Sequence, residues 1–359
     1  MKINKRSIIY ILCASNHDTG GPKDLHQLGQ ELKKLGKKFY MFYYPGNSKD
    51  PVHKNFKTYK LPITNTINDS KRNILIVPEI DQAITFSKKF KNIKKILYWQ
   101  SLDNFFITHY SFQVPKFIKS IIKKPFKMIY FFNEITQNYF GNLSFPKYLK
   151  TIYLNFPFKN FLKVDGFDLN LSQSYYQYKI LDSKKIKSYI LADYIREEYF
   201  NAAKKLKLKN KKNIICYNPK KSSRFMKRII NDNPSIKFIP LENYDLKQVI
   251  NILSKSKIYM DFGFHPGVDH LPREAAILRN CVITNKEGSA FYKKAVSIDD
   301  RFKFEEKKKN LNKIKLLIKK IFNDFDNEVN NFNKYVFKLK KEKSEYKKQV
   351  LKIFSKSSI

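Results

Sequence analysis

With 359 residues, the chain has room for about two domains, each large enough to bury a core of its own. Hydrophobic residues form 42% and aromatic residues 15% of it, which excludes an intrinsically disordered protein although 28% of the residues are charged. The formal net charge of +40 comes mainly from Lys and is spread along the chain together with abundant Asn, Ile, Tyr and Phe. A solvated Lys-rich surface explains this charge; attraction to an anionic membrane stays open, and a nucleic-acid partner is not expected.

Cys13, Cys216 and Cys281 lie singly in apolar runs, without the spacing of a metal site or a redox pair, and predict reduced thiols in a cytosolic protein. The first residues, MKINKRSIIYILCASNH, resemble a signal peptide in their basic head and apolar run. The run is short and leads into a polar loop and an amphipathic helix, so a first core strand is the better interpretation. The sequence contains no stretch of about 18 apolar residues, so it predicts no membrane-spanning helix. We therefore expect a cytoplasmic protein, with peripheral contact at the inner face of a membrane as an option.

The first half of the chain alternates strand-like and helix-like segments. Residues 7–15 form a continuous apolar run, as in a strand buried on both faces. After the loop NHDTGGPKD, leucines recur at helical spacing until Gly36 supplies a stop. Further strands are predicted at 38–44, 73–80, 94–101 and 187–193. This alternation is typical of a mainly parallel, helix-covered sheet.

Residues 104–161 have a different residue pattern: they mix aromatic residues and lysines without the regular alternation of strand-like and helix-like segments. They are either a helical insertion in the first domain or a basic amphipathic surface that contacts anionic lipid.

The pattern restarts in the second half. Strands are predicted at 213–219, 236–243, 257–263 and 281–284, with helices at 222–232 and 246–256. From residue 307 onward the chain is a long Lys-rich helical pattern. The sequence thus predicts an α/β protein with two Rossmann-like domains, 1–192 and 193–306, and a helical extension, 307–359.

The stretch DFGFHPGVDHLPREAAILRNCVITNKEGSA, residues 261–290, combines a polar glycine loop, a short helix and a buried strand. We expect the helix to begin at Pro272, a favoured first helical position, which places Arg273 and Glu274 in the first turn. The planar guanidinium of Arg273 suits a phosphate group.

The segments TGGPKDLHQLGQELKKLG and HPGVDHLPREAAILRNCVIT resemble GT-B glycosyltransferases, particularly the family 4-like group. The resemblance implies two Rossmann-like domains that face a cleft, with the nucleotide-sugar donor mainly against the second. It implies transfer of a sugar to a glycan or lipid-linked acceptor, as in polysaccharide biosynthesis, without a cofactor. A nucleotide-sugar epimerase of similar architecture and a basic nucleic-acid-binding protein are the alternatives.

The resemblance implies roles for several residues of the second domain. Lys220, Lys221 and Arg224 match the basic group that holds the donor diphosphate just after the first strand of this domain. Gly288 and the amide of Ser289 follow another strand, where they would approach a phosphate; a plain turn is the alternative for Gly288.

Glu274 matches the glutamate that hydrogen-bonds the donor ribose, whereas a purely electrostatic role at the helix start is the alternative. Typical members carry another glutamate eight residues earlier, where this chain has Pro266, preceded by His265. The sugar-contacting acid is therefore absent or moved to Asp269. His265 is either a contact of the sugar or a phosphate, with a catalytic role, or a structural loop residue.

In the first domain, Gly20 and Gly21 allow close approach of the backbone to a ligand, which the resemblance supports. Asp18 or His17 is a candidate base for an acceptor hydroxyl, and a turn or cap role is the alternative. The only DxD-like segment is DFD at 324–326, in the Lys-rich helical tail. We therefore expect no metal and a metal-independent transfer.

Overall fold

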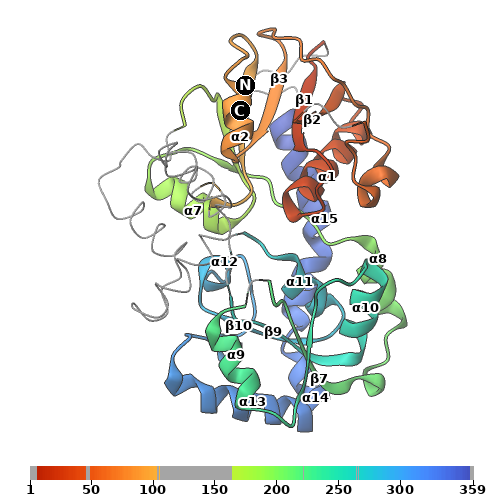
Figure 1. The fold of residues 1–359 in the computed structure, drawn as a ribbon, viewed down its shortest axis with the longest axis vertical. Coiled ribbons are helices and arrows are strands. Elements are labelled where there is room, and N and C mark those ends of the chain that lie inside the picture. The colour runs from red at the N-terminus through yellow and green to blue at the C-terminus, as the bar shows by residue number, and fades with distance from the viewer. Residues whose placement is uncertain are drawn as a thin grey trace, which may run out of the picture. The chain divides into compact units, whose positions relative to one another are not determined.

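The computed structural model describes residues 6–45, 49–102, 105, 164–220, 222–263, 265 and 267–355. The chain forms two compact units. Unit 1 comprises Met1–Ala192 with Lys347–Ile359, and unit 2 comprises Asp193–Tyr346. Each unit contains a parallel sheet accompanied by helices, which confirms the predicted α/β class (Figure 1). Apart from Phe105, the predicted insertion at 104–161 lies outside the described residues.

Unit 1 is built on a 6-stranded sheet with the order β2-β1-β3-β4-β5-β6, in which all neighbouring strands run parallel. Its strands are β1 (Ile9–Ala14), β2 (Phe39–Tyr44), β3 (Ile74–Pro78), β4 (Lys94–Trp99), β5 (Leu169–Ser172) and β6 (Tyr189–Ile190). The apolar run of β1 pairs on both sides, with β2 and β3, which explains why its sequence shows no polar alternation.

The helices of unit 1 follow its strands. They are α1 (Gly20–Lys34), α2 (Asp81–Ser87) and α7 (Tyr175–Ser183), and a 3-10 helix covers Lys54–Tyr59. Leu25, Leu28 and Leu32 of α1 are buried, as their spacing predicts. The end of α15 (Asn333–Phe354) also belongs to unit 1, where the Ala192 amide donates to Gln349 Oε1 at 2.8 Å.

Unit 2 is built on a 5-stranded parallel sheet with the order β11-β10-β9-β7-β8. Its strands are β7 (Lys212–Tyr217), β8 (Lys237–Pro240), β9 (Ser256–Asp261), β10 (Cys281–Asn285) and β11 (Lys303–Phe304). Its helices are α8 (Glu197–Lys205), α9 (Arg224–Asn231), α10 (Leu246–Lys255), α11 (His270–Ile277), α12 (Gly288–Phe291), α13 (Leu311–Asn323), α14 (Phe325–Asn330) and most of α15. Helices α13 to α15 bury apolar side chains such as Ile318 and Leu339 in the core of this unit. The segment 307–359 is accordingly shared between the two units.

Three strands depart from the sequence prediction, and one of them is the two-residue strand β11, which was not predicted. The sequence of β5, LNLS, carries two polar residues in four and was not predicted as a strand. Its pairing with β4 leaves Leu171 and Ser172 fully buried, so tertiary contacts override the local propensity. The strand predicted at 187–193 is reduced to the two residues of β6.

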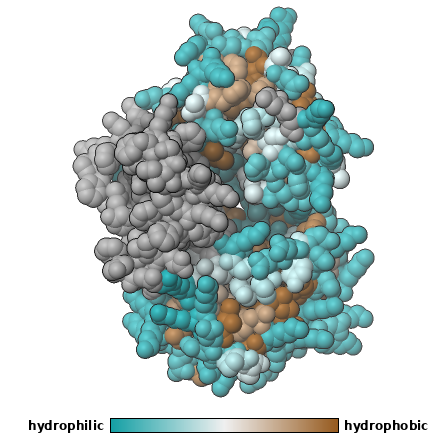
Figure 2. Space-filling model, in the orientation of Figure 1, coloured by the Kyte–Doolittle hydropathy of each residue, from teal (hydrophilic) through white to brown (hydrophobic). Residues whose placement is uncertain are grey.

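The surface and the thiols agree with the composition. Hydrophilic residues cover most of the described surface in Figure 2, interrupted by small hydrophobic patches in both units. The three cysteines are buried and unpaired. Within the described ranges, no helix has both the length and the apolar character that crossing a membrane requires.

A buried carboxyl group connects two strand ends of unit 1. Glu79 follows β3 and is 2% exposed, and its two oxygens accept the amides of Gln100 at 3.0 Å and Ser101 at 2.8 Å, just after β4. Burial raises the pKa of Glu79 from 4.5 to about 7, although the amide bonds oppose this shift.

We predict that Glu79 makes the free energy of unfolding fall as the pH rises from about 4.5 to about 7, because the folded protein then binds the proton that the unfolded chain has lost. The contribution is about 3 kcal/mol. Urea denaturation of Glu79→Gln across this range should give a shallower dependence on pH. An unchanged slope would contradict the assignment, whatever the effect of the substitution on stability at one pH.

Candidate functional site

The predicted donor region lies where neighbouring parallel strands of unit 2 end, the position at which open α/β sheets bind ligands. Strand β9 lies between β7 and β10, so the segments that follow these strands are neighbours. Ser222, after β7, forms an isolated bridge with Gly263, and the Ser223 amide donates to the Phe262 carbonyl at 2.8 Å. Phe262 and Gly263, at the start of the β9–α11 loop (residues 262–269), therefore contact the β7–α9 connection.

Groups at the end of β10 and just after it donate hydrogen bonds to carbonyl groups of this loop. Asn285 is fully buried, and its Nδ2 donates to the Gly263 carbonyl at 2.6 Å. The Ser289 amide donates to the His265 carbonyl at 3.0 Å, and its hydroxyl donates to the Gly267 carbonyl. These carbonyl oxygens consequently face donors inside the protein.

Gly288 is required by this close approach of two backbones. Its φ is +50°, and a Cβ at this position would lie 2.1 Å from the His265 carbonyl oxygen. The structure thus corrects the prediction for Gly288 and Ser289: the close approach is to the β9–α11 loop of the chain itself, and the Ser289 amide is used to hold that loop.

His265 is 1% exposed and lies between two acidic residues. Its Nδ1 is 2.7 Å from Asp269 Oδ2, and its Nε2 is 3.3 Å from the Asp261 carbonyl oxygen. A carboxylate and a carbonyl both accept hydrogen bonds, so these contacts orient the imidazole ring of His265. The Asp261 carboxylate lies 3.9 Å from Nε2.

Asp261, His265 and Asp269 are also close enough together to be considered as ligands of one cation. Both ring nitrogens of His265 are already engaged, and Asp261 Oδ2 accepts the Tyr259 hydroxyl at 3.0 Å. Binding of a metal would cost at least one of these hydrogen bonds, so the donor set fits a hydrogen-bonded histidine better than a metal site.

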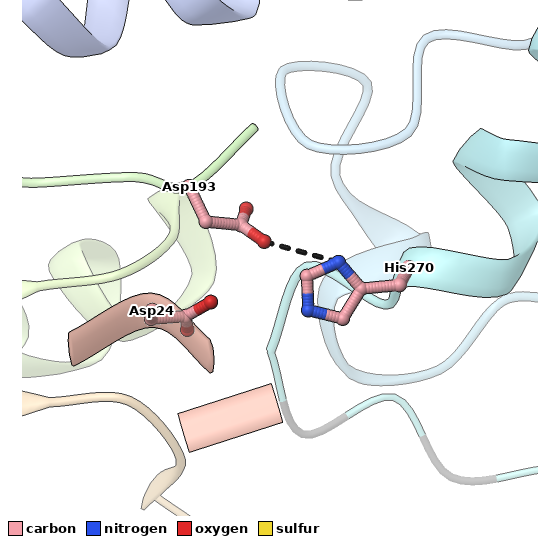
Figure 3. Close-up of side chains that lie close together, drawn as sticks. All are labelled: Asp24, Asp193 and His270. Carbon is pink, nitrogen blue, oxygen red and sulfur yellow. Dashed lines mark ion pairs between the residues drawn. The ribbon is translucent and has the colours of Figure 1, made fainter. Parts of the chain in front are cut away.

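Arg273 has a different role from the predicted phosphate contact. It is 1% exposed, and its Nη2 contacts both carboxylate oxygens of Asp193 at 2.8 Å. Its Nη1 donates to Glu342 Oε2 at 3.0 Å. Asp193 also pairs with His270 Nδ1 at 3.1 Å, as Figure 3 shows. Because these partners and the loop occupy the guanidinium, Arg273 is corrected from a ligand contact to a buried structural cation.

Helix α11 begins at His270 with Asp269 as its N-cap, two residues before the predicted start at Pro272. Arg273 and Glu274 consequently lie in the second turn, so the helix dipole has less influence on Glu274 than expected. Glu274 is 6% exposed and accepts a hydrogen bond from the Tyr199 side chain. Burial and this carboxylate raise the pKa of Tyr199, so the phenol stays the donor.

The predicted basic group lies at the β7–α9 connection. Lys220 is exposed, and its amide donates to Asn218 Oδ1 at 3.1 Å, which makes a turn. Arg224 is the half-buried first residue of α9. The N-cap residue Ser223 has a buried hydroxyl that lacks a hydrogen-bond partner among the described residues. Lys221 lies outside the described residues.

In unit 1, α1 begins at Gly20, and a Cβ on Gly21 would lie 3.0 Å from Gln100 Oε1. Gln100 Nε2 donates to the Gly21 carbonyl at 2.9 Å, so the close approach at Gly21 is again to the chain itself.

The two candidate bases of unit 1 both form hydrogen bonds within the protein. Asp18 accepts a hydrogen bond from Asn55 Nδ2. His17 is exposed, and its Nδ1 donates to the Ser15 carbonyl at 2.6 Å, which leaves Nε2 as the acceptor in the neutral ring.

Solved structures share this architecture across the whole chain, whereas no protein-family model and no curated protein sequence matches it. HepE from Anabaena in complex with UDP-glucose has 8% sequence identity and a TM-score of 0.57, covering 98% of this chain and 100% of that one. A glycosyltransferase from Rickettsia africae has 13% identity and a TM-score of 0.52, covering 98% and 95%. Sucrose-phosphate synthase from Thermosynechococcus elongatus has 11% identity and a TM-score of 0.53, covering 98% and 100%. The chain has the GT-B glycosyltransferase fold.

The GT-B fold of this chain brings most of the predicted donor residues together within unit 2. They lie on the β9–α11 loop, the following helix, the start of α12 and the β7–α9 connection: His265, Asp269, Arg273, Glu274, Gly288, Ser289, Lys220 and Arg224. The residues predicted for the acceptor side, Asp18, His17, Gly20 and Gly21, belong to unit 1.

Several residues that shape the predicted donor region were not singled out from the sequence. Asn285 is the last residue of β10, and a polar residue at the end of an apolar strand is a usable signal in retrospect. Asp193 and Glu342 reach Arg273 from 80 and 69 residues away, so no local pattern points to them.

We predict that Gly288→Ala displaces the β9–α11 loop and lowers the melting temperature. The added Cβ must move the His265 carbonyl, and the positive φ adds strain for any L-residue. We expect a loss of about 2 kcal/mol. Gly36→Ala is the control, since Gly36 also has a positive φ but an open surrounding. An equal loss of stability in the two variants would mean that the positive φ alone causes it, and would contradict the role of the contact with His265.

Proposed function

We propose that this chain is a glycosyltransferase that moves a sugar from a nucleotide-sugar donor to a glycan or lipid-linked acceptor without a metal ion. The proposal rests on the GT-B fold and on the β9–α11 loop of unit 2. Among the structures with this fold, that of HepE contains UDP-glucose. Unit 2 would bind the donor, and unit 1 would supply the acceptor side.

The observation that carries this proposal is the orientation of the loop's carbonyl groups. Those of Gly263, His265 and Gly267 accept hydrogen bonds from Asn285 and Ser289. A carbonyl oxygen facing a phosphate would repel it, whereas carbonyls engaged elsewhere leave an anion to face amides and cations. The loop is therefore suited to a sugar diphosphate before any ligand arrives, which lowers the cost of ordering it.

The leaving diphosphate would be stabilised at the start of α9. A helix N-terminus offers backbone amides and a favourable dipole to an anion. Arg224 begins this helix, and Lys220 lies in the preceding turn. The buried hydroxyl of the N-cap residue Ser223 has no hydrogen-bond partner among the described residues. Together they supply the cations and dipoles that a divalent ion supplies in other enzymes.

On the acceptor side, His17 is the better candidate for a base than Asp18. Its Nδ1 donates to the Ser15 carbonyl, so the neutral ring presents a lone pair on Nε2. Asp18 accepts a hydrogen bond from Asn55. A Lys-rich surface would hold the protein beside an anionic membrane that carries a lipid-linked acceptor.

We predict that Glu274→Ala weakens the binding of a nucleotide sugar by about 1.5–3 kcal/mol, the cost of losing a charged hydrogen bond to the ribose. Isothermal titration calorimetry with UDP-glucose measures this directly. Tyr199→Phe is the control, because it removes the hydrogen bond that Glu274 accepts within the protein and keeps the carboxylate. If the affinity for UDP-glucose falls equally in both variants, or in neither, Glu274 does not bind the ribose.

We also predict that transfer persists in excess chelator, because cations and helix dipoles stabilise the leaving group. Arg224→Ala should reduce turnover about tenfold or more, as expected for the loss of a charged contact in the transition state. Lys227→Ala removes the same charge one turn further along α9 and should change turnover little. Activity abolished by chelator and restored by magnesium or manganese would contradict this design.

Thermal-shift measurements with a panel of nucleotide sugars test the proposal as a whole, since a ligand that binds only the folded state raises its melting temperature. Stabilisation by one nucleotide sugar, together with release of its nucleoside diphosphate on addition of an acceptor, is the expected result. No stabilisation by any donor would contradict it.

A further inference from the structure

One buried side chain bonds both to the β9–α11 loop and to residues at the two sequence limits of unit 2. Arg273 Nε donates to the Asp269 carbonyl at 3.1 Å, and Nη2 donates to the Val268 carbonyl at 3.1 Å. The same guanidinium contacts Asp193, the first residue of unit 2, and Glu342, four residues before its last residue Tyr346.

We propose that Arg273 is a positioning residue, through which Asp193 and Glu342 hold the β9–α11 loop in the shape that binds the donor. This inference rests on the proposed function, and it concerns residues that would not touch the donor themselves. Asp269 transmits the position of Arg273 to His265, because its carbonyl accepts from Nε while its carboxylate holds His265 Nδ1 at 2.7 Å.

The charges explain why arginine suits this position. Burial alone would lower the pKa of Arg273, but the carboxylates of Asp193 and Glu342 raise it, so the guanidinium stays charged. Burial raises the pKa of Glu342 to about 7 against the opposing effect of Arg273. A planar fork with five N–H groups can serve two carboxylates and two carbonyls in fixed directions, which a lysine ammonium with three donors cannot.

The geometry separates this role from simple core stability. A buried ion pair adds little net stability compared with apolar packing, yet breaking one by removing a partner is costly. A side chain that also donates to two consecutive carbonyls fixes the local direction of the backbone. The expected consequence of altering it is therefore a change concentrated in residues 263–270, the loop and the first residue of α11.

Arg273→Lys keeps the charge and removes the fork. We expect amide hydrogen exchange of peptides that cover 263–270 to accelerate about tenfold, equal to about 1.4 kcal/mol of opening free energy, while β9 and β10 exchange as in the unaltered protein. The dissociation constant of UDP-glucose should rise about tenfold. Arg301→Lys is the matched control, since Arg301 pairs with Glu328 at 2.9 Å elsewhere in unit 2.

Glu342→Leu provides a second measurement if Arg273→Lys does not fold. It leaves Arg273 and Asp193 in place, and the same loop-centred acceleration is expected. Acceleration spread evenly over unit 2, or equal to that of Arg301→Lys, would overturn the positioning role. Failure of the unaltered protein to bind UDP-glucose would count against that donor in the proposed function, and the exchange pattern would still decide the role of Arg273.

Discussion

Backbone carbonyl groups in the β9–α11 loop of unit 2 need hydrogen-bond donors, and they find them in residues that lie elsewhere along the chain. Asn285, Ser289 and Arg273 supply these donors from the end of β10, the start of α12 and the second turn of α11. Because buried carbonyls are rarely left without a partner, this arrangement determines the path of the loop more strongly than its own sequence does. The positions of His265 and Asp269 follow from it.

The same constraint explains why a glycine is needed at position 288. Its backbone passes so close to the His265 carbonyl that a side chain has no space. A glycine after a strand in an α/β sheet is readily interpreted as a phosphate contact, since both roles require a close approach of the backbone. Here the approach is to the protein's own loop, at the His265 carbonyl.

The sequence predicts the fold of this chain better than its site. Apolar runs such as 7–15 and the helical leucines that follow are local signals, and the structure contains the strand β1 and the helix α1 that they indicate. The strand β5 has no such signal, because its burial depends on β4, about 70 residues away. Arg273 was predicted as a phosphate contact, but its guanidinium is buried against two carboxylates. Its partners are set by tertiary packing, which no spacing in the sequence records.

Buried lysine side chains in unit 2 donate hydrogen bonds to backbone carbonyl groups. Lys211 donates to the carbonyls of Leu253 and Ser256, and burial lowers its pKa to about 7. Lys303 donates to the carbonyls of Ala290 and Val296, and burial lowers its pKa to about 8. A neutral amine still has two N–H donors for two carbonyls, so either lysine can lose its charge and keep its hydrogen bonds. Arg273 faces two carboxylates and cannot lose its charge. The permanent charge of arginine therefore suits position 273, where two carboxylates are partners, and lysine suits positions 211 and 303, where the hydrogen-bond partners are carbonyl groups.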